Sequence, residues 1–188
     1  VADKGTQNIV NMIGFNYRLT EIQAAIASEQ LKKLDVLLAK RSEVAKFFTE
    51  RLSKLPMITP PNVQQDIRSG FYLYAMKYDS SDSGVSRDRF AEAIRAEGVP
   101  VATGYVEPIY MQPVYQQRIG YGRDGFPFTY PGNRGNFNYE PGICPVTERM
   151  YFEELITTNL CHADMTAKDM EDVVKAFEKV ANNMDELK

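Results

Sequence analysis

The feature that most constrains this chain is a stretch of 36 residues, from Thr20 to Leu55, that contains neither Gly nor Pro. Apolar residues recur through it mostly at three- and four-residue steps, which is the period of an α-helix with one buried face. Thr20 followed by Gln23 matches a capping box, and Pro56 ends the pattern. An unbroken helix over this range would be about 54 Å long at ~1.5 Å per residue. A helix of that length is expected to bridge two bodies or to support an oligomer.

The rest of the chain mixes short strands with helices. An aromatic-rich run and two apolar runs have the length and composition of strands, and three other segments have helical spacing or helix-start signals. The predicted strands are 71–78, 99–105 and 155–160, and the predicted helices are 87–97, 146–154 and the segment that opens at Thr166. The expected fold class is therefore α+β, with a long N-terminal helix followed by a small mixed or antiparallel sheet covered by helices.

This pattern divides the chain into three parts. Residues 1–19 are expected to form an N-terminal segment that ends in a turn, residues 20–55 the long bridging helix, and residues 56–188 a small C-terminal α+β domain. Because the first residue is Val1 and not Met, the chain is expected to be a processed piece or a fragment of a longer protein.

Composition excludes several classes of function. With 22 basic and 25 acidic residues the net charge is −3, which argues against a dedicated nucleic-acid binder. No apolar run approaches the roughly 18–20 residues that cross a bilayer, so no membrane partner is expected. Cys144, Cys161 and His162 are the only cysteines and the only histidine, which excludes a disulfide framework and a zinc site built on several such ligands. The reducing cytoplasm is the expected compartment.

The turn before the long helix is the first candidate site. The run Gly14-Phe15-Asn16-Tyr17-Arg18 combines an amide that can donate to a phosphate with a guanidinium that can bind phosphate or carboxylate through two N–H groups. The N-terminus of the following helix adds a favourable dipole for an anion. The alternative is a structural turn, in which Asn16 caps the backbone and Arg18 makes a surface ion pair.

Residues 117–142 form a long segment of unusual composition. Six aromatic residues stand there among Gly, Pro and Asn: Tyr121, Phe126, Phe128, Tyr130, Phe137 and Tyr139. A long loop of this kind is expected to be functional, flexible or both. Its rings and arginines can stack on sugars or bases, whereas its weak charge favours the alternative of a packed lid or a dimer contact.

Two further places are candidates for ligand contact. Tyr105 and Tyr110 flank a Pro-rich turn, where a phenol can hydrogen-bond a ligand and where simple packing is an equal alternative. Cys161 and His162 are adjacent, and neighbours on a strand point to opposite faces, so they are not expected to act as a thiolate–imidazole pair. His162 alone stays a candidate contact.

The turn, the helix after it and several later landmarks resemble one known family. Residues 14–26 begin with a G-[YF]-N-[YF]-R turn and continue into an alanine-containing helix, and the stretch 30–35 with Arg41 completes that block. Gly104-Tyr105, the Pro- and Tyr-rich stretch 108–115 and residues 142–148 are similar to the family's C-terminal landmarks. By these residues the chain resembles the C-terminal part of a DegT/DnrJ/EryC1/StrS sugar aminotransferase.

The resemblance implies a pyridoxal 5'-phosphate enzyme of aspartate aminotransferase fold (fold type I), which moves an amino group from glutamate or glutamine to a keto-sugar, often linked to a nucleotide. It implies that Asn16 reaches the cofactor phosphate of the neighbouring subunit in a homodimer. The candidate substrate contacts, on the same view, are Tyr17, Arg18, Tyr105, Tyr110 and His162. Tyr110 stands where many members carry His.

The resemblance also implies that the lysine bonded to the cofactor as a Schiff base lies upstream of the turn, in an N-terminal domain absent from this sequence. We therefore expect no catalytic residue and no metal ligand set in this chain. Alone, it is expected to be inactive and to bind the cofactor weakly or not at all.

Three alternatives stay open at this point. A dehydratase or a regulator of the same family would share these landmarks. A non-catalytic sugar- or nucleotide-binding module would use the aromatic loop instead. A dimerisation module would use the long helix only to assemble subunits.

Overall fold

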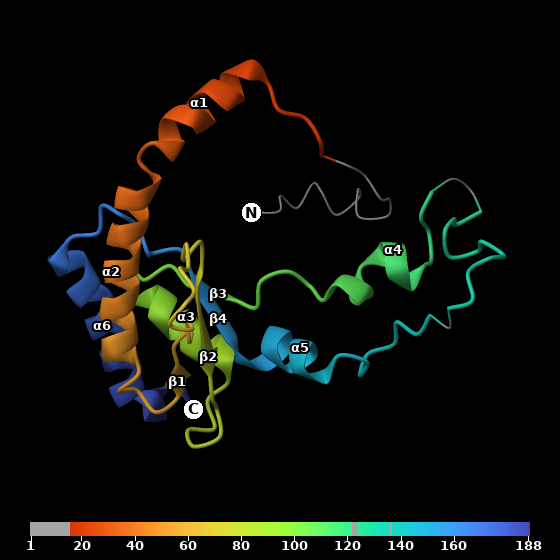
Figure 1. The fold of residues 1–188 in the computed structure, drawn as a ribbon. Helices are drawn as coiled ribbons and strands as arrows, with labels where there is room; N and C mark the ends of the chain where they lie inside the picture. Colours follow the sequence, from red (N-terminus) through yellow and green to blue (C-terminus); the bar gives the residue numbers. More distant parts are fainter. Residues whose placement is uncertain (1–15, 122–123, 136) are drawn as a thin grey trace. The chain divides into compact units, whose positions relative to one another are not determined.

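A computed structural model describes residues 16–121, 124–135 and 137–188 (Figure 1). Residues 1–15 of the predicted N-terminal segment 1–19, with Gly14 and Phe15 of the candidate turn, lie outside the described residues. Among the described residues the chain forms two compact units. Unit 1 contains 16–19 and 106–148, and unit 2 contains 20–105 and 149–188.

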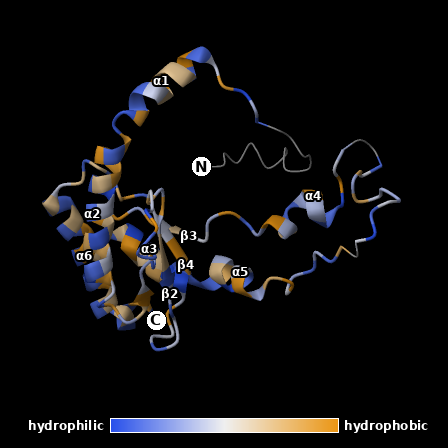
Figure 2. Cartoon of the chain, viewed as in Figure 1, coloured by the Kyte–Doolittle hydropathy of each residue, from blue (hydrophilic) through white to orange (hydrophobic). Residues whose placement is uncertain are grey.

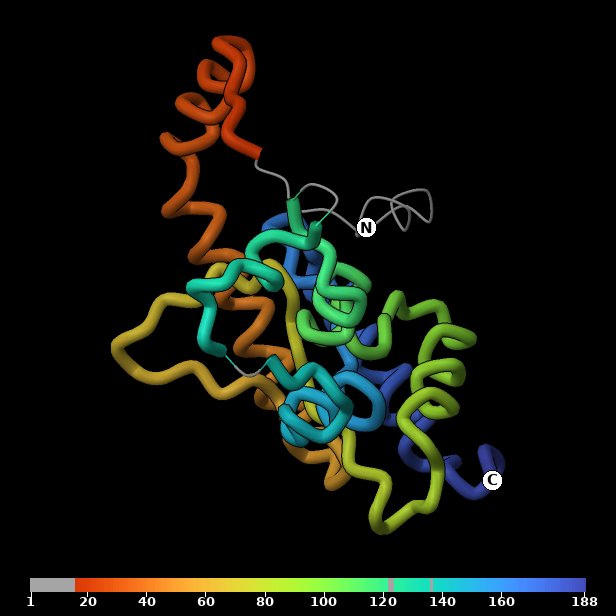
Figure 3. The backbone as a smooth tube through the Cα atoms, turned by 90° about the vertical axis from the view of Figure 1, so that its right-hand side faces the viewer, coloured from red at the N-terminus to blue at the C-terminus, as the bar shows by residue number. Residues whose placement is uncertain are grey.

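Unit 2 is built on a four-stranded antiparallel sheet. Its strands are β1 (Ile58–Thr59), β2 (Tyr74–Tyr78), β3 (Ala102–Thr103) and β4 (Leu155–Thr158), in the order β1-β2-β4-β3. The central pair is in register with Tyr74 opposite Thr158 and Lys77 opposite Leu155. The three predicted strands are thus confirmed, although each is shorter than its apolar run. β1 was not predicted, and the long loop that leads from it to β2 is drawn in yellow in Figure 3.

The helices are divided between the two units. Those of unit 2 are α1 (Glu21–Leu31), α2 (Leu34–Leu52), α3 (Arg87–Ala96), η3 (Met150–Glu154), α6 (Ala167–Asn182) and η4 (Met184–Leu187). Unit 1 contains η2 (Ile109–Met111) and α4 (Pro113–Gln116), and α5 (Pro145–Arg149) leads from unit 1 into η3. The helix predicted over 146–154 is present, but its second half is wound as a π-helix. The α+β expectation is confirmed.

The core of unit 2 lies between one face of the sheet and three helices. Tyr74, Met76 and Tyr78 alternate along β2 and are at most 2 % exposed. Phe48 of α2 packs edge-on against Tyr74, and Phe90 of α3 stacks on Tyr78. Hydrophobic and hydrophilic residues alternate along α2, α3 and α6 as expected for helices with one buried side (Figure 2).

The helix predicted over 20–55 is interrupted at Lys32 and Lys33. The N–H of Lys33 donates to the carbonyl of Gln30 (3.0 Å), which closes a tight turn between α1 and α2. Arg68 then binds both the carboxylate of Asp35 (2.8 Å) and its backbone carbonyl (3.1 Å). No Gly or Pro stands at the break, and this contact fixes the first turn of α2 to a distant loop.

The first helix differs from α2 in having no buried residue. Its capping box is present as predicted, since Gln23 N–H donates to the Thr20 hydroxyl (3.3 Å) and Thr20 N–H donates to the Gln23 side chain (2.9 Å). Ile22 is 75 % and Ile26 58 % exposed. Local capping therefore defines where α1 starts, while its apolar side chains have no cover within unit 2.

The part of the chain that the structure describes contains neither a membrane-spanning helix nor a cluster of potential metal ligands. None of its helices is both long and apolar enough to cross a bilayer. The same residues contain no group of three or more His, Cys, Asp or Glu side chains that could hold a metal ion.

Candidate functional site

The candidate phosphate-binding turn is described from Asn16 onward. Asn16, Tyr17 and Arg18 lie outside helices and strands, and all three side chains are exposed, Tyr17 by 90 %. The segment 16–20 contains an amide, a guanidinium and a threonine hydroxyl but no acidic side chain. These donors suit the phosphate group of pyridoxal phosphate, so the residues present fit the cofactor's anionic end.

The Glu148 carboxylate in unit 1 accepts hydrogen bonds from three donors. Glu148 accepts from the backbone N–H groups of Gly142 (2.7 Å) and Cys144 (3.2 Å), and its carboxylate also accepts from the Tyr110 hydroxyl. Glu148 lies in the first turn of α5, where Pro145 begins the helix. The carboxylate therefore holds the segment before α5 and the Pro-rich turn around Tyr110 to one point.

These contacts shift the pKa of both side chains. The Tyr110 hydroxyl and, less strongly, the Gly142 and Cys144 N–H groups stabilise the charged carboxylate and lower the pKa of Glu148 below its usual 4.5. Loss of water around Tyr110, together with the neighbouring carboxylate, raises the pKa of its phenol to about 12. Tyr110 is thus protonated at neutral pH, and it is 9 % exposed. The Tyr110 hydroxyl already donates its proton to Glu148, so this oxygen could only accept a hydrogen bond from a ligand. The predicted contact of Tyr110 with substrate stays a prediction.

Replacing Tyr110 by Phe is expected to raise the pKa of Glu148, because the donor that lowers it most is removed. A lowered folded-state pKa stabilises the fold above the ordinary pKa, and this contribution is lost as the pH falls through the lowered value. The acid-induced loss of stability should therefore be smaller in the variant below about pH 4.5. A carboxyl NMR titration of Glu148 checks the first point, and urea unfolding at several pH values checks the second. An unchanged Glu148 titration would contradict the assignment.

Tyr105 follows Gly104, where the backbone has a conformation that favours glycine. Gly104 has φ +64° and its N–H donates to the carbonyl of Leu155 (2.8 Å), while a side chain there would meet Tyr151 at 3.0 Å. This close approach sets the direction in which the chain leaves β3. Tyr105 itself is 62 % exposed. The structure thus presents Tyr105 at the surface of unit 2, whereas Tyr110 is buried in unit 1.

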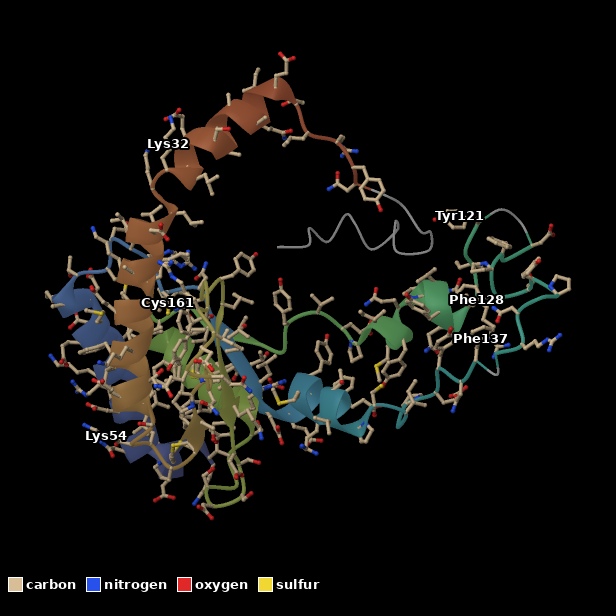
Figure 4. All side chains as sticks on the ribbon, in the orientation of Figure 1. Lys32, Lys54, Tyr121, Phe128, Phe137 and Cys161 are labelled. Atoms are coloured by element: carbon tan, nitrogen blue, oxygen red, sulfur yellow. The ribbon has the colours of Figure 1, made fainter. Side chains whose placement is uncertain are left out.

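Cys161 and His162 are separated as predicted. Cys161 is fully buried in the core of unit 2, and burial raises the pKa of its thiol to about 11 (Figure 4). His162 is exposed, and its backbone N–H donates to the carbonyl of Leu160 (2.7 Å). A neutral buried thiol beside an outward-facing imidazole cannot act as a nucleophilic pair. His162 stays a single candidate contact.

The residues that sequence reasoning missed are polar side chains that bind distant backbone. Gln116 donates through one amide nitrogen to the carbonyls of both Tyr110 and Tyr139 (2.8 Å each), and Arg118 donates to the carbonyl of Phe137 (2.9 Å). Together with Glu148 they tie the two ends of the aromatic loop to each other. Of these three residues, only Glu148 could be noticed in the sequence, because it is an acidic residue in the first turn of a helix that begins with Pro.

Comparison with known proteins shows which protein family the chain matches and which proteins are similar to it in sequence. A family model described as the DegT/DnrJ/EryC1/StrS aminotransferase family matches residues 1–131. The spore coat polysaccharide biosynthesis protein SpsC of Bacillus subtilis is 25 % identical over 172 residues, which are 92 % of this chain and 39 % of SpsC. GDP-perosamine synthase of Caulobacter vibrioides is 35 % identical over 89 residues, 47 % of this chain and 24 % of that enzyme. The chain thus spans well under half of these relatives.

Solved structures agree in fold. The aminotransferase from Psychrobacter cryohalolentis superposes with a TM-score of 0.68 at 22 % identity, over 92 % of this chain and 41 % of that one. At this identity the likeness establishes the fold alone.

Proposed function

Since the chain belongs to the DegT/DnrJ/EryC1/StrS aminotransferase family, we propose that it is the C-terminal part of an enzyme that moves an amino group from glutamate or glutamine to a keto-sugar linked to a nucleotide. The observation that carries the proposal is the match of one family model to residues 1–131. GDP-perosamine synthase, among the relatives, carries a nucleotide sugar in its name.

In this proposal the turn holds the cofactor. The Asn16 amide donates to the phosphate of pyridoxal phosphate bound in the neighbouring subunit of a homodimer, and the Arg18 guanidinium contacts the substrate. Pyridoxal phosphate, when bound, supplies the electron sink for amino-group transfer. The exposure of both side chains supports the assignment, because a group that reaches across to a partner cannot be packed within its own unit.

The rest of the site is proposed to lie elsewhere in a longer protein. An upstream domain would supply the lysine that bonds the cofactor, and the assembled enzyme would work in the cytoplasm. From this chain, Tyr17, Tyr105 and His162 present exposed polar groups suited to hydrogen bonds with a sugar. Tyr110 would act at most as an acceptor, because its hydroxyl donates to Glu148.

The test compares this chain with the longer protein. With added pyridoxal phosphate and glutamine, this chain alone is expected to show no cofactor band in the visible spectrum and no transfer of ¹⁵N from glutamine to a nucleotide-linked keto-hexose. The longer protein should show both. A covalently bound cofactor in this chain alone would overturn the proposed division between the two parts.

In the longer protein, Asn16→Ala should weaken pyridoxal phosphate binding about tenfold, the loss expected from one charge-assisted hydrogen bond of roughly 1.5 kcal/mol. Equilibrium dialysis of the cofactor measures the effect. Asn62→Ala is the matched control, because Asn62 is also an exposed loop amide. Equal affinities for the two variants would remove Asn16 from the site.

A further inference from the structure

Arg87 is the one charged residue that is buried among the described residues, at 6 % exposure. It stands at the first position of α3, directly after the N-cap Ser86. A cation there faces the positive end of the helix dipole, and removing a charge from water costs free energy. Two unfavourable conditions at one side chain need a compensating interaction, and the hydrogen bonds of Arg87 show where that interaction lies.

The guanidinium of Arg87 joins α3 to the π-helix η3. Its Nε and Nη2 donate to one carboxylate oxygen of Asp88 (2.9 and 2.7 Å), and its Nη1 donates to the backbone carbonyl of Tyr151 (2.6 Å). Asp88 is the next residue in the chain, so this ion pair links no distant elements. Carbonyls in the last turn of a helix lack helical donors. Arg87 supplies a donor to the Tyr151 carbonyl from 64 positions away in the sequence.

The carbonyl that Arg87 binds also borders Gly104. A side chain at Gly104 would stand 3.0 Å from that oxygen and 3.0 Å from the Tyr151 ring. Gly104 donates its N–H to the carbonyl of Leu155 (2.8 Å), the residue directly after η3, and it precedes the exposed Tyr105. A continuous series of contacts therefore leads from Arg87 through Tyr151 to the turn that carries Tyr105.

We propose that Arg87 is a positioning residue: it holds the carbonyl of Tyr151 beside Gly104 and so fixes the direction in which Tyr105 leaves the sheet. This inference rests on the proposed function, in which Tyr105 contacts the sugar. Because Arg87 is buried in unit 2, it would act through Tyr105 and not by touching the substrate. The π-winding of η3 supports a role beyond stability, since single π-turns are frequent at functional sites.

Amide hydrogen exchange of this chain, followed by NMR, tests the positioning. Arg87→Gln should speed exchange of the Gly104 N–H about tenfold relative to the amides of β2 and β4, because a hydrogen bond from a charged group is lost beside it. Arg95→Gln is the matched control, since Arg95 is also on α3 and also donates to a backbone carbonyl, that of Val101 (3.2 Å). It should leave the Gly104 exchange rate unchanged.

Two results of this measurement would overturn the proposal. Equal acceleration of all amides by Arg87→Gln would show a role in stability alone, and an unchanged Gly104 rate, or an equal change in Arg95→Gln, would remove the selective link. Circular dichroism identifies a variant that fails to fold. Should Arg87→Gln fail, Arg87→Lys decides, because it keeps the charge, loses the planar fork and should show the same selective change. Failure of both variants to fold would also reject a positioning role.

Kinetics of the longer protein test whether Arg87 acts through Tyr105. Arg87→Gln should raise KM for the nucleotide-linked keto-hexose about fivefold, the loss expected from one neutral hydrogen bond, and leave KM for glutamine unchanged. Added to Tyr105→Ala, it should have no further effect, because no contact is left to position. Additive effects would overturn the route through Tyr105.

The two measurements also separate this inference from the proposed function. Selective exchange at Gly104 in this chain, with no amino transfer by the longer protein, would reject the proposed function and keep the positioning by Arg87. Amino transfer by the longer protein, with unselective exchange in Arg87→Gln, would keep the proposed function and reject the positioning.

Discussion

Replacing Phe90 by Ala is expected to lower the free energy of unfolding by about 3–5 kcal/mol. Phe90 is fully buried, its ring stacks on Tyr78 with centroids 4.8 Å apart, and it lies 6.2 Å from Phe177. It therefore joins α3 to the sheet and to α6 at once. A truncation would leave a cavity between three elements that cannot all close in on it. Urea unfolding followed by far-UV circular dichroism measures the loss.

Phe152→Ala is the control for that measurement. Phe152 is the same residue type but is 51 % exposed, and its one aromatic neighbour among the described residues is Tyr151. Its replacement should change the free energy of unfolding by no more than about 0.5 kcal/mol, as surface substitutions usually do. If both variants lost the same stability, the core would not lie where α3, α6 and β2 place it.

Elements with strong local signals could be predicted from the sequence. Thr166 with Asp169 and Ser86 before Arg87 are capping signals, and α6 and α3 begin where these signals stand. Cys161 was expected to face away from His162, and Cys161 is buried while His162 is exposed, but both lie beyond the end of β4, so strand alternation is not the reason. For the two caps the deciding interaction lies within four residues along the chain, which is the range that a local pattern can report.

Features made by contacts between distant residues could not be predicted. The break between α1 and α2 is accompanied by the contact of Arg68 with Asp35, 33 positions apart. β1 is two residues long and exists because Ile58 pairs with Tyr78. No periodicity is visible in two residues, and no local rule indicates which loop arginine will bind which helix.

The candidate site shows the same division. The candidate donors Asn16 and Arg18 could be named from residue types alone, because an amide and a guanidinium are donors that suit a phosphate. Glu148 accepts hydrogen bonds from the Tyr110 hydroxyl and from the Gly142 N–H. Tyr110 and Glu148 are 38 positions apart in the sequence, so only the fold shows that they are in contact. The order of the aromatic loop likewise depends on Gln116 and its two distant carbonyl partners.

Replacing Gly104 by Ala is expected to cost about 2–5 kcal/mol of stability. The backbone there is left-handed, at φ +64°, which disfavours any L-residue by roughly 1–2 kcal/mol. The new methyl group would also stand 3.0 Å from both the ring and the carbonyl oxygen of Tyr151, and overpacking of this kind adds about 1–3 kcal/mol. The Gly104 N–H is bonded to Leu155, so the segment cannot move aside without losing a sheet-edge hydrogen bond. Thermal and urea unfolding measure the cost.

Gly98→Ala separates the two contributions. Gly98 is also left-handed, at φ +90°, but a side chain there would meet nothing within 4 Å. It should therefore show the backbone cost of roughly 1–2 kcal/mol without the steric one. The difference between the two variants measures how tightly η3 packs on the end of β3, and equal losses would mean that Tyr151 yields freely. A tight contact would also fix the direction in which the chain leaves β3 toward Tyr105, so Gly104→Ala should disturb that predicted substrate contact where Gly98→Ala does not.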